Sequence, residues 1–188
     1  MVMFASENLY LSGMAQNQLL FLMLQFKKLL YIGRLDKDVG FDICVELCLL
    51  LKDKYKIKFE IIGDGELKPL IPKTAKFFGS VTNPDIYVSR NDVIYTTGFL
   101  TFLEAAIAKK LIIASYADPV RRDYVLMHPI SKYMVTGSKA SEIKAKLESL
   151  SLNDVNLMTK NAYNWAKLQT WEKLAKQHEE IWFGGKHR

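Results

Sequence analysis

The sequence predicts a doubly wound α/β fold built on a parallel sheet. From residue 29 onward, short apolar runs of strand length alternate with helical patterns, and the connections between them are short and rich in turn residues. Strands that are separated by helices pair in parallel through right-handed crossovers. Ligands bind such sheets at the carboxyl ends of the strands, so the turns that follow the strands are the first places to look for a site.

The elements follow one another in regular order. The first strand is expected at Leu29–Ile32, where an apolar run ends at a glycine, and a helix over 39–52 follows because apolar residues recur there at helical spacing. The remaining strands are expected over 56–62, 75–78, 93–95, 111–114 and 133–135, and the remaining helices over 66–71, 84–89, 99–108, 119–127, 139–150 and 153–182, the last broken near Gln169.

The chain divides into three parts. With 188 residues, 49% of them hydrophobic, it can bury a sizeable core, and residues 29–183 are expected to form one domain. The segment 1–28 contains an apolar run over 19–24 that is shorter than the ~20 residues that span a bilayer. We expect that segment to be a helix facing a membrane surface or a partner, or the remnant of a missing domain. Residues 184–188 are expected to be a mobile tail.

Charge and cysteine content give weaker indications. The formal net charge of +6 favours anionic partners such as nucleotides, nucleic acid or an acidic membrane surface, but the surplus is modest and spread along the chain. Cys44 and Cys48 share a helix face with no further Cys or His nearby, so they are interpreted as reduced core residues rather than metal ligands. A cytoplasmic location fits this interpretation, with peripheral contact at a membrane left open.

The segment 91–106 is the most informative in the chain. A buried strand, Val93-Ile94-Tyr95, runs through Thr96-Thr97-Gly98, which offers a hydroxyl N-cap and a flexible turn, into a helix that is apolar nearly all round. We therefore expect this helix in the interior, with Thr101 and Glu104 on one of its faces. Because an unpaired buried carboxylate costs free energy, Glu104 is expected to have a partner such as a ligand hydroxyl.

Three turns end strands at the predicted binding edge: Gly33-Arg34, Gly63-Asp64-Gly65 and Thr97-Gly98. The forked guanidinium of Arg34 suits a phosphate, and the alternative is an exposed arginine paired with Asp36 or Asp38. The second turn lacks the third glycine of the dinucleotide fingerprint and the lysine of a P-loop, so dehydrogenase and kinase functions are disfavoured.

Five segments, taken in order, carry a resemblance to a known family. They are Leu30-Tyr31-Ile32-Gly33-Arg34-Leu35 with Gly40-Phe41-Asp42; Glu60-Ile61-Ile62-Gly63-Asp64-Gly65-Glu66-Leu67; Phe77-Phe78-Gly79-Ser80-Val81; Leu103-Glu104-Ala105-Ala106-Ile107-Ala108 with Lys110-Leu111-Ile112-Ile113-Ala114; and the closing helices from Asn161 to Trp182. Together they resemble the C-terminal, donor-binding half of the GT-B glycosyltransferases, specifically the retaining group 1 or family 4 type. This resemblance covers most of the chain.

The resemblance implies a Rossmann-like domain that binds a nucleoside diphosphate sugar, for transfer to a saccharide or lipid-linked acceptor in polysaccharide biosynthesis. It implies no cofactor, no metal and no nucleic-acid partner. Arg34 and the N–H groups at the start of the helix would hold the diphosphate, Glu104 would accept hydrogen bonds from the ribose, and backbone groups after the third strand would hold the base. The donor-binding positions expected are Arg34, Lys37, Gly79, Val81, Gly98, Phe99, Leu100, Thr101 and Glu104.

The chain departs from the family pattern at two positions and in its architecture. Thr96 stands where the family has its first glutamate, and Val39 stands where it has a lysine, for which Lys37 could substitute. Only 28 residues precede the first strand, where the family has an N-terminal acceptor domain, so the chain is not expected to catalyse transfer alone. A partner chain that supplies this domain, a non-catalytic nucleotide-binding module, a subunit of a split enzyme and a nucleotide-sugar epimerase remain alternatives. No catalytic residue is identified.

The remaining features have structural interpretations. The three histidines, His128, His178 and His187, form no cluster and are interpreted as surface or packing residues. Arg121 and Arg122 are interpreted as a solvated helix face, with contact to a sugar, a phosphate or an anionic lipid as the alternative. The apolar residues of the closing helices are expected to pack on the sheet, in preference to a partner-binding face. They are Trp165, Leu168, Trp171, Leu174, Ile181 and Trp182.

Overall fold

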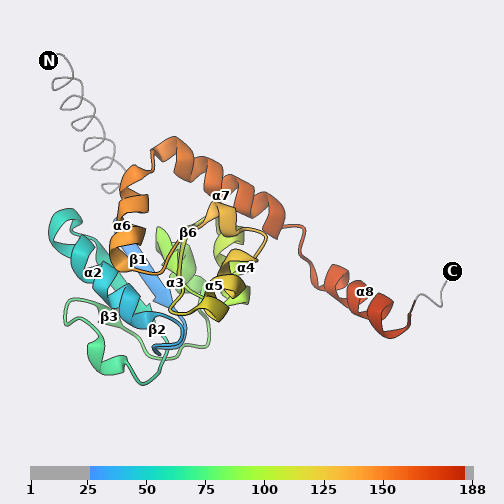
Figure 1. Ribbon diagram of the computed structural model, residues 1–188, viewed down its shortest axis with the longest axis horizontal. Helices are drawn as coiled ribbons and strands as arrows, with labels where there is room; N and C mark the ends of the chain where they lie inside the picture. The colour runs from blue at the N-terminus through green and yellow to red at the C-terminus, as the bar shows by residue number, and fades with distance from the viewer. Residues whose placement is uncertain (1–25, 185–188) are drawn as a thin grey trace, which may run out of the picture.

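The computed structural model describes residues 26–184 and contains one six-stranded sheet, in which every neighbouring pair of strands is parallel (Figure 1). The strand order is β3-β2-β1-β4-β5-β6, so the order reverses between β1 and β4. The predicted doubly wound parallel fold is confirmed. The strands are β1 Lys28–Ile32, β2 Lys58–Ile62, β3 Lys76–Phe77, β4 Val93–Tyr95, β5 Leu111–Ser115 and β6 Val135–Gly137.

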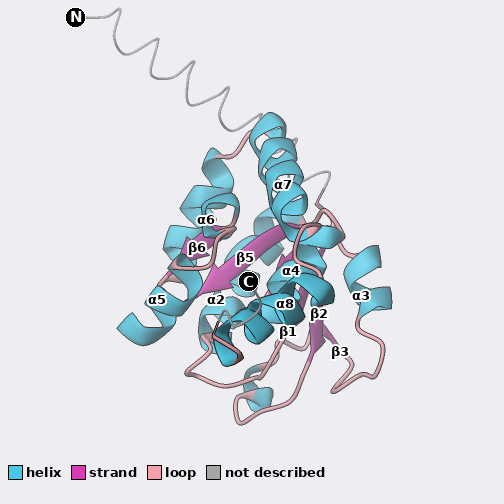
Figure 2. Cartoon of the chain, turned by 90° about the vertical axis from the view of Figure 1, so that its right-hand side faces the viewer, coloured by secondary structure: helices cyan, strands magenta, loops and turns pink. Residues whose placement is uncertain are grey.

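Helices cover both faces of the sheet (Figures 1 and 2). The first face carries α2 Phe41–Tyr55 and α6 Ala140–Ser149, and the second carries α3 Asp85–Arg90, α4 Phe99–Ile107, α5 Pro119–Leu126 and the C-terminal half of α7 Leu152–Ala166. Two short 3-10 helices span Lys68–Leu70 and Ser131–Tyr133, and a last helix, α8, spans Trp171–Trp182. Within residues 26–184 no helix is long and apolar enough to cross a bilayer.

Each face of the sheet buries its own apolar core. Cys44 and Cys48 are buried in the first core, beside Tyr31 and Phe41, as the sequence predicts. The second core centres on strand residues such as Ile94 and on the inward face of α4. Because successive strand residues point to opposite faces, strands buried on both sides are apolar throughout, and this is why they are visible in the sequence.

The turns after β1, β2 and β3 are joined to one another by backbone hydrogen bonds. The N–H of Gly63 donates to the carbonyl of Gly79 (2.9 Å), and the N–H of Leu35 donates to the carbonyl of Asp64 (2.9 Å). Gly63 has φ +137°, and a Cβ built on it would lie 1.8 Å from the carbonyl oxygen of Gly33. Only glycine fits there, so the close approach of these turns depends on that residue.

Two element boundaries differ from the prediction for local reasons. The sixth strand begins at Val135, not at residue 133, because residues 131–133 form a 3-10 turn and pairing with β5 starts with Ile113 beside Val135. Helix α2 begins at Phe41, not at residue 39, because Gly40 at its N-cap is left-handed, with φ +71°.

The prediction that the helix at 99–108 is interior is wrong. Phe102, Ala105 and Ala106 of α4 are buried, but Leu100 is 59% exposed, and Glu104 and Ile107 are exposed as well. The outer face of α4 therefore reaches solvent, and Glu104 is not the buried carboxylate that the sequence suggested.

The expectation that the closing helices pack on the sheet holds only as far as Trp165, which is partly buried against the second core. The chain breaks after α7 as predicted, and α8 then extends away from the sheet (Figure 1). Trp171, Ile181 and Trp182 are each more than 70% exposed, so the packing prediction is wrong for α8. The expectations for residues 1–25 and 185–188 lie outside the described residues.

Candidate functional site

Four charged side chains meet at the carboxyl end of β1. Arg34 donates from Nη1 to Oδ2 of Asp36 (2.8 Å) and from Nη2 to Oδ2 of Asp38 (2.5 Å), and Arg121, from α5, donates to the same oxygen of Asp38 (2.8 Å). Burial alone would raise the pKa of Asp38, but the hydrogen bonds from Arg121 and Arg34 hold it below its usual value. The hydrogen bond to Asp38 in turn raises the pKa of Arg34. The pairing of Arg34 with both aspartates matches the alternative that the sequence left open, and it leaves a phosphate role untested.

Lys37 lies on the same loop, between the two aspartates. Its side chain is exposed, and its backbone carbonyl accepts the N–H of Gly40 (2.9 Å). This loop therefore has the forked cation that phosphate recognition uses at Arg34 and a second, solvated cation at Lys37.

The start of α4 faces the same edge of the sheet. The predicted hydroxyl N-cap is wrong: the N-cap residue is Gly98, and the buried Thr96 hydroxyl instead accepts the N–H of Gly98 (3.3 Å). The N–H of Phe99 donates to the Tyr124 hydroxyl on α5 (3.1 Å). The N–H groups of Leu100 and Thr101 follow in the first turn, where an α-helix has no internal acceptor.

Glu104 lies one turn further along α4, on its exposed face. Within residues 26–184 its carboxylate has no hydrogen-bond or ion-pair partner. Burial raises the pKa of Glu104, and the negative charge of Asp85 at the start of α3 adds to the shift. The charge of Asp85 thus disfavours ionisation of Glu104, whose carboxylate makes no hydrogen bond with another described residue.

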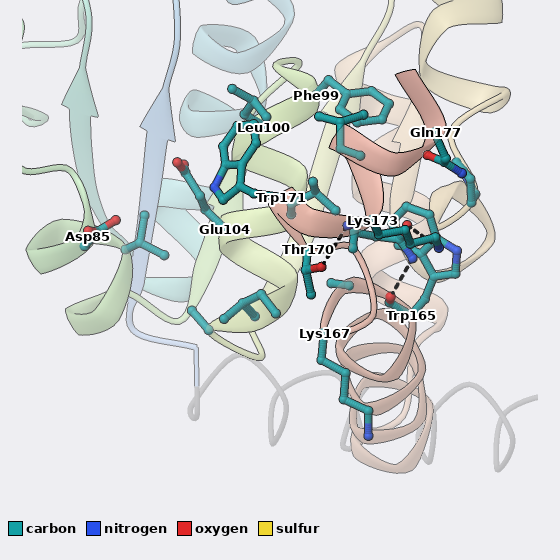
Figure 3. A pocket seen from close by; sticks show the side chains of 18 of the residues that line it. Asp85, Phe99, Leu100, Glu104, Trp165, Lys167, Thr170, Trp171, Lys173 and Gln177 are labelled. Carbon is teal, nitrogen blue, oxygen red and sulfur yellow. Dashed lines mark hydrogen bonds between the residues drawn. The ribbon is translucent and has the colours of Figure 1, made fainter. Parts of the chain in front are cut away.

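A cavity of about 840 Å³ lies beside Glu104, between α3, α4 and the chain from the end of α7 into α8 (Figure 3). Its lining is largely apolar, with Leu100 and Trp171 among the residues (Figure 3). Asp85 and Glu104 supply carboxylates, and Lys167 and Lys173 supply ammonium groups. A pocket with an apolar wall and a few polar groups is the usual form of a small-molecule site.

The turn after β3, where the base is expected, is less well defined. Gly79 is left-handed, with φ +67°, and its carbonyl accepts the N–H of Gly63 (2.9 Å). Val81 is partly buried and packs against the second core. Both residues lie at the same edge of the sheet as Arg34, but neither lines the cavity beside Glu104.

His128 lies beneath the start of α4, where it packs between rings. Its ring centroid is 4.3 Å from that of Phe99 and 5.5 Å from that of Trp165. Burial lowers the pKa of His128 to about 4, and its Nε2 has no partner among the described residues. His128 is therefore a packing residue, which is one of the two roles, surface or packing, expected for the histidines from the sequence.

The structure divides the predicted donor-binding residues into two groups. The carboxyl edge of the sheet holds Arg34, Lys37, Gly79, Val81 and the backbone at Gly98, whereas Phe99, Leu100 and Glu104 line the cavity. Thr101, in the first turn of α4, does not line the cavity. Sequence reasoning gave no site role to Tyr124 or Asp85 and preferred a solvated face for Arg121. The available signal was the i, i+3 spacing of Arg121 and Tyr124 directly after β5, which places both on one helix face at the binding edge.

Comparison with known proteins gives similarity at the level of structure. No family model matches the sequence, and no curated protein matches it. The C-terminal domain of LpcC, a group 1 family glycosyl transferase from Francisella tularensis, superposes with a TM-score of 0.61 and 19% identity, over 76% of this chain and 85% of that one. This likeness covers nearly the whole of that domain.

Two longer glycosyltransferases are also similar. WaaG, involved in lipopolysaccharide biosynthesis, superposes with a TM-score of 0.63 and 15% identity over 86% of this chain. HepE of Anabaena, in complex with UDP and glucose, gives a TM-score of 0.63 and 14% identity over 90% of this chain. This chain spans 48% of WaaG and 52% of HepE, about half of each. The fold is thus the Rossmann-like fold found in GT-B glycosyltransferases.

Proposed function

We propose that this chain is the donor-binding domain of a glycosyltransferase of the retaining group 1 or family 4 type. In this proposal it binds a nucleoside diphosphate sugar for transfer to a saccharide or lipid-linked acceptor. The acceptor site would come from an N-terminal domain of the kind that the family resemblance implies. A cytoplasmic location, with peripheral contact at a membrane, is part of the same proposal.

The observation that carries the proposal is the unpartnered carboxylate of Glu104 beside the cavity. An ionised carboxylate only accepts hydrogen bonds, and the charge that raises the pKa of Glu104 belongs to another carboxylate, Asp85. A ligand that supplies two neutral hydroxyl donors would satisfy Glu104 without adding charge. The vicinal hydroxyls of a ribose have this chemistry, which supports the role that the family resemblance implies.

The first test is nucleotide binding by calorimetry, with UDP, GDP, ADP and uridine as probes. UDP is the first choice because HepE was solved with UDP. Hydrogen bonds to a charged group contribute about 1.5–3 kcal/mol, so Glu104→Ala should weaken the binding of UDP by at least about tenfold. Uridine should weaken by a similar factor, because it carries the same ribose.

A double comparison separates a ribose contact from a general loss of structure. Removing the ribose 2′-hydroxyl from UDP should weaken binding to the wild-type chain but have a much smaller effect on Glu104→Gln. Glu46→Gln, on α2 at the opposite face of the sheet, is the matched control and should bind like wild type. Unchanged UDP affinity in a folded Glu104→Ala chain would refute the ribose contact, and no binding of any nucleotide by the wild-type chain would refute the proposed function.

A second candidate is a nucleotide-binding module without transferase activity. Thr96, which stands where the family has its first glutamate, is fully buried, and its hydroxyl accepts the N–H of Gly98. It therefore does not offer the donor sugar a carboxylate or an exposed hydroxyl. Donor hydrolysis or transfer, measured with the nucleotide sugar that binds best, distinguishes the two candidates.

A further inference from the structure

Arg121 lies outside the segments to which the family resemblance assigns phosphate binding. Its guanidinium nevertheless donates to the same carboxylate oxygen of Asp38 as the guanidinium of Arg34. The two arginines are 87 residues apart, and they are brought together because β1 and β5 flank β4 in the sheet. Both donate to Oδ2 of Asp38, at 2.5 Å from Arg34 and 2.8 Å from Arg121. Two guanidinium groups that converge on one anionic oxygen form a site for an anion with more oxygens than a carboxylate has.

Helix α5 holds Arg121 in this position. The carboxylate of Asp118 caps the helix by accepting the N–H of Arg121 (2.9 Å). Tyr124, three residues further on, accepts the N–H of Phe99 at the start of α4 (3.1 Å). One face of α5 thus contacts both the β1–α2 loop and the N-terminus of α4, which are the two places where a diphosphate is expected.

The bonds that hold Asp38 are of the kind that a ligand can displace. The side chains of Arg34 and Asp38 are 57% and 48% exposed, and ion pairs at that exposure contribute little to stability because water screens them. A diphosphate carries more negative charge and more acceptor oxygens, so it can engage both arginines and take the place of Asp38. The exposed Phe99 N–H, now bonded to Tyr124, lies at the positive end of the α4 dipole.

We propose that Arg121 is a second diphosphate-binding residue, which acts together with Arg34, and that Asp38 holds the two guanidinium groups in place until the diphosphate displaces it. This inference rests on the proposed function, because it assigns a residue to the diphosphate of the same donor. It assigns to α5 a direct contact with the ligand, in addition to covering the sheet.

The test compares uridine with UDP, since the two differ only in the diphosphate. Arg121→Met keeps the length of the side chain and removes its charge, so UDP binding should weaken by about tenfold or more while uridine binding stays within about twofold. The matched control is Arg122→Met, because Arg122 pairs with Asp123 and not with Asp38. That variant should bind both ligands like wild type.

Asp38→Asn supplies an independent measurement that does not remove an arginine. If Asp38 occupies the position of the diphosphate, its neutralisation should strengthen UDP binding several-fold and leave uridine unchanged. Wild-type affinity for UDP in Arg121→Met, with its fold confirmed by circular dichroism, would overturn the inference while leaving the proposed function standing. If Arg121→Met does not fold, unchanged or weaker UDP binding by Asp38→Asn would overturn it. A wild-type chain that binds neither UDP nor uridine would instead refute the proposed function itself.

Discussion

The two ends of the candidate site differ in how their charges are satisfied. At the proposed phosphate end, Arg34 and Arg121 are paired with Asp36 and Asp38, and the Phe99 N–H already has an acceptor. At the proposed nucleoside end, the Glu104 carboxylate has no hydrogen-bond or ion-pair partner within residues 26–184 and lies beside a cavity that Asp85 also lines. In the proposed function, a diphosphate would exchange partners at the first end and a ribose would supply hydroxyl donors at the second. Under this proposal, charge should govern affinity at the phosphate end and hydroxyl donation should govern it at the nucleoside end.

The backbone beneath the phosphate end gives the largest expected effect. In Gly63→Ala the new Cβ would lie 1.8 Å from the Gly33 carbonyl oxygen, at a φ that disfavours side chains. The joined turns would have to separate, and we expect the free energy of unfolding to fall by about 4 kcal/mol or more. Denaturant unfolding measures this.

Gly79→Ala is the matched control for that variant. Gly79 is also left-handed, but its Cβ would meet no atom within 4 Å. Gly79→Ala should therefore lower the free energy of unfolding only by its backbone strain, about 1–2 kcal/mol. Equal losses for the two alanine variants would show that close contact between the turns does not fix the phosphate end.

His128, which packs beneath Phe99 at the start of α4, gives the next largest expected effect on stability. Its folded pKa of about 4 lies below the ordinary 6.5, so the unfolded chain binds the proton first as pH falls. The stability contribution is fully present above about pH 7 and is lost as pH falls through 6.5 toward 4. Between pH 7 and pH 5, protonation of His128 in the unfolded chain should lower the free energy of unfolding by about 2 kcal/mol.

His128→Leu should remove that part of the pH dependence. Unfolding free energies at pH 7 and pH 5 measure the difference, and His178→Leu, on the exposed helix α8, is the control. If the loss of stability between the two pH values were the same in His128→Leu and in wild type, His128 would not be buried in its neutral form.

The charge at the nucleoside end has a smaller effect, visible as a change in pH dependence. Burial and Asp85 raise the pKa of Glu104. In the proposed function, only ionised Glu104 would accept hydrogen bonds from both ribose hydroxyls. Uridine affinity should therefore fall as pH drops through the Glu104 pKa. Asp85→Asn removes one cause, so the midpoint should move to lower pH, with affinity above the midpoint changed by less than about threefold. A midpoint unaffected by Asp85→Asn would indicate that the two carboxylates do not interact.

Helix α8 gives the smallest effect on stability, although it lines the cavity at the nucleoside end. Trp182 is 73% exposed, so Trp182→Ala should change the free energy of unfolding by less than about 0.5 kcal/mol. Trp165→Ala, at the partly buried end of α7, should cost clearly more. Similar losses for both variants would show that α8 packs on the domain in solution.

Much of the fold was predictable because its signals are local. Strands such as Val93–Tyr95 are apolar on both faces and short, and the break after Ala166 is marked by the polar Gln169 and Thr170. The start of β6 was misplaced because Tyr133 and Val135 are equally compatible with a strand, and only pairing with β5 decides between them. Glu104 was predicted to be buried because its helix is apolar nearly all round, but its exposure depends on what covers α4.

The sequence by itself determined the parallel α/β fold, the turns at its carboxyl edge, the position of Arg34 at one of those turns and the position of Glu104 in the helix that follows another. These features follow from periodicity and from residue types at strand ends, which act over a few residues. The tertiary structure alone decided that Arg121 shares Asp38 with Arg34, that Tyr124 reaches Phe99 and that α8 leaves the outer face of α4 open. Such contacts depend on strand order and on how far each helix packs back onto the sheet. Neither property is encoded within a single segment.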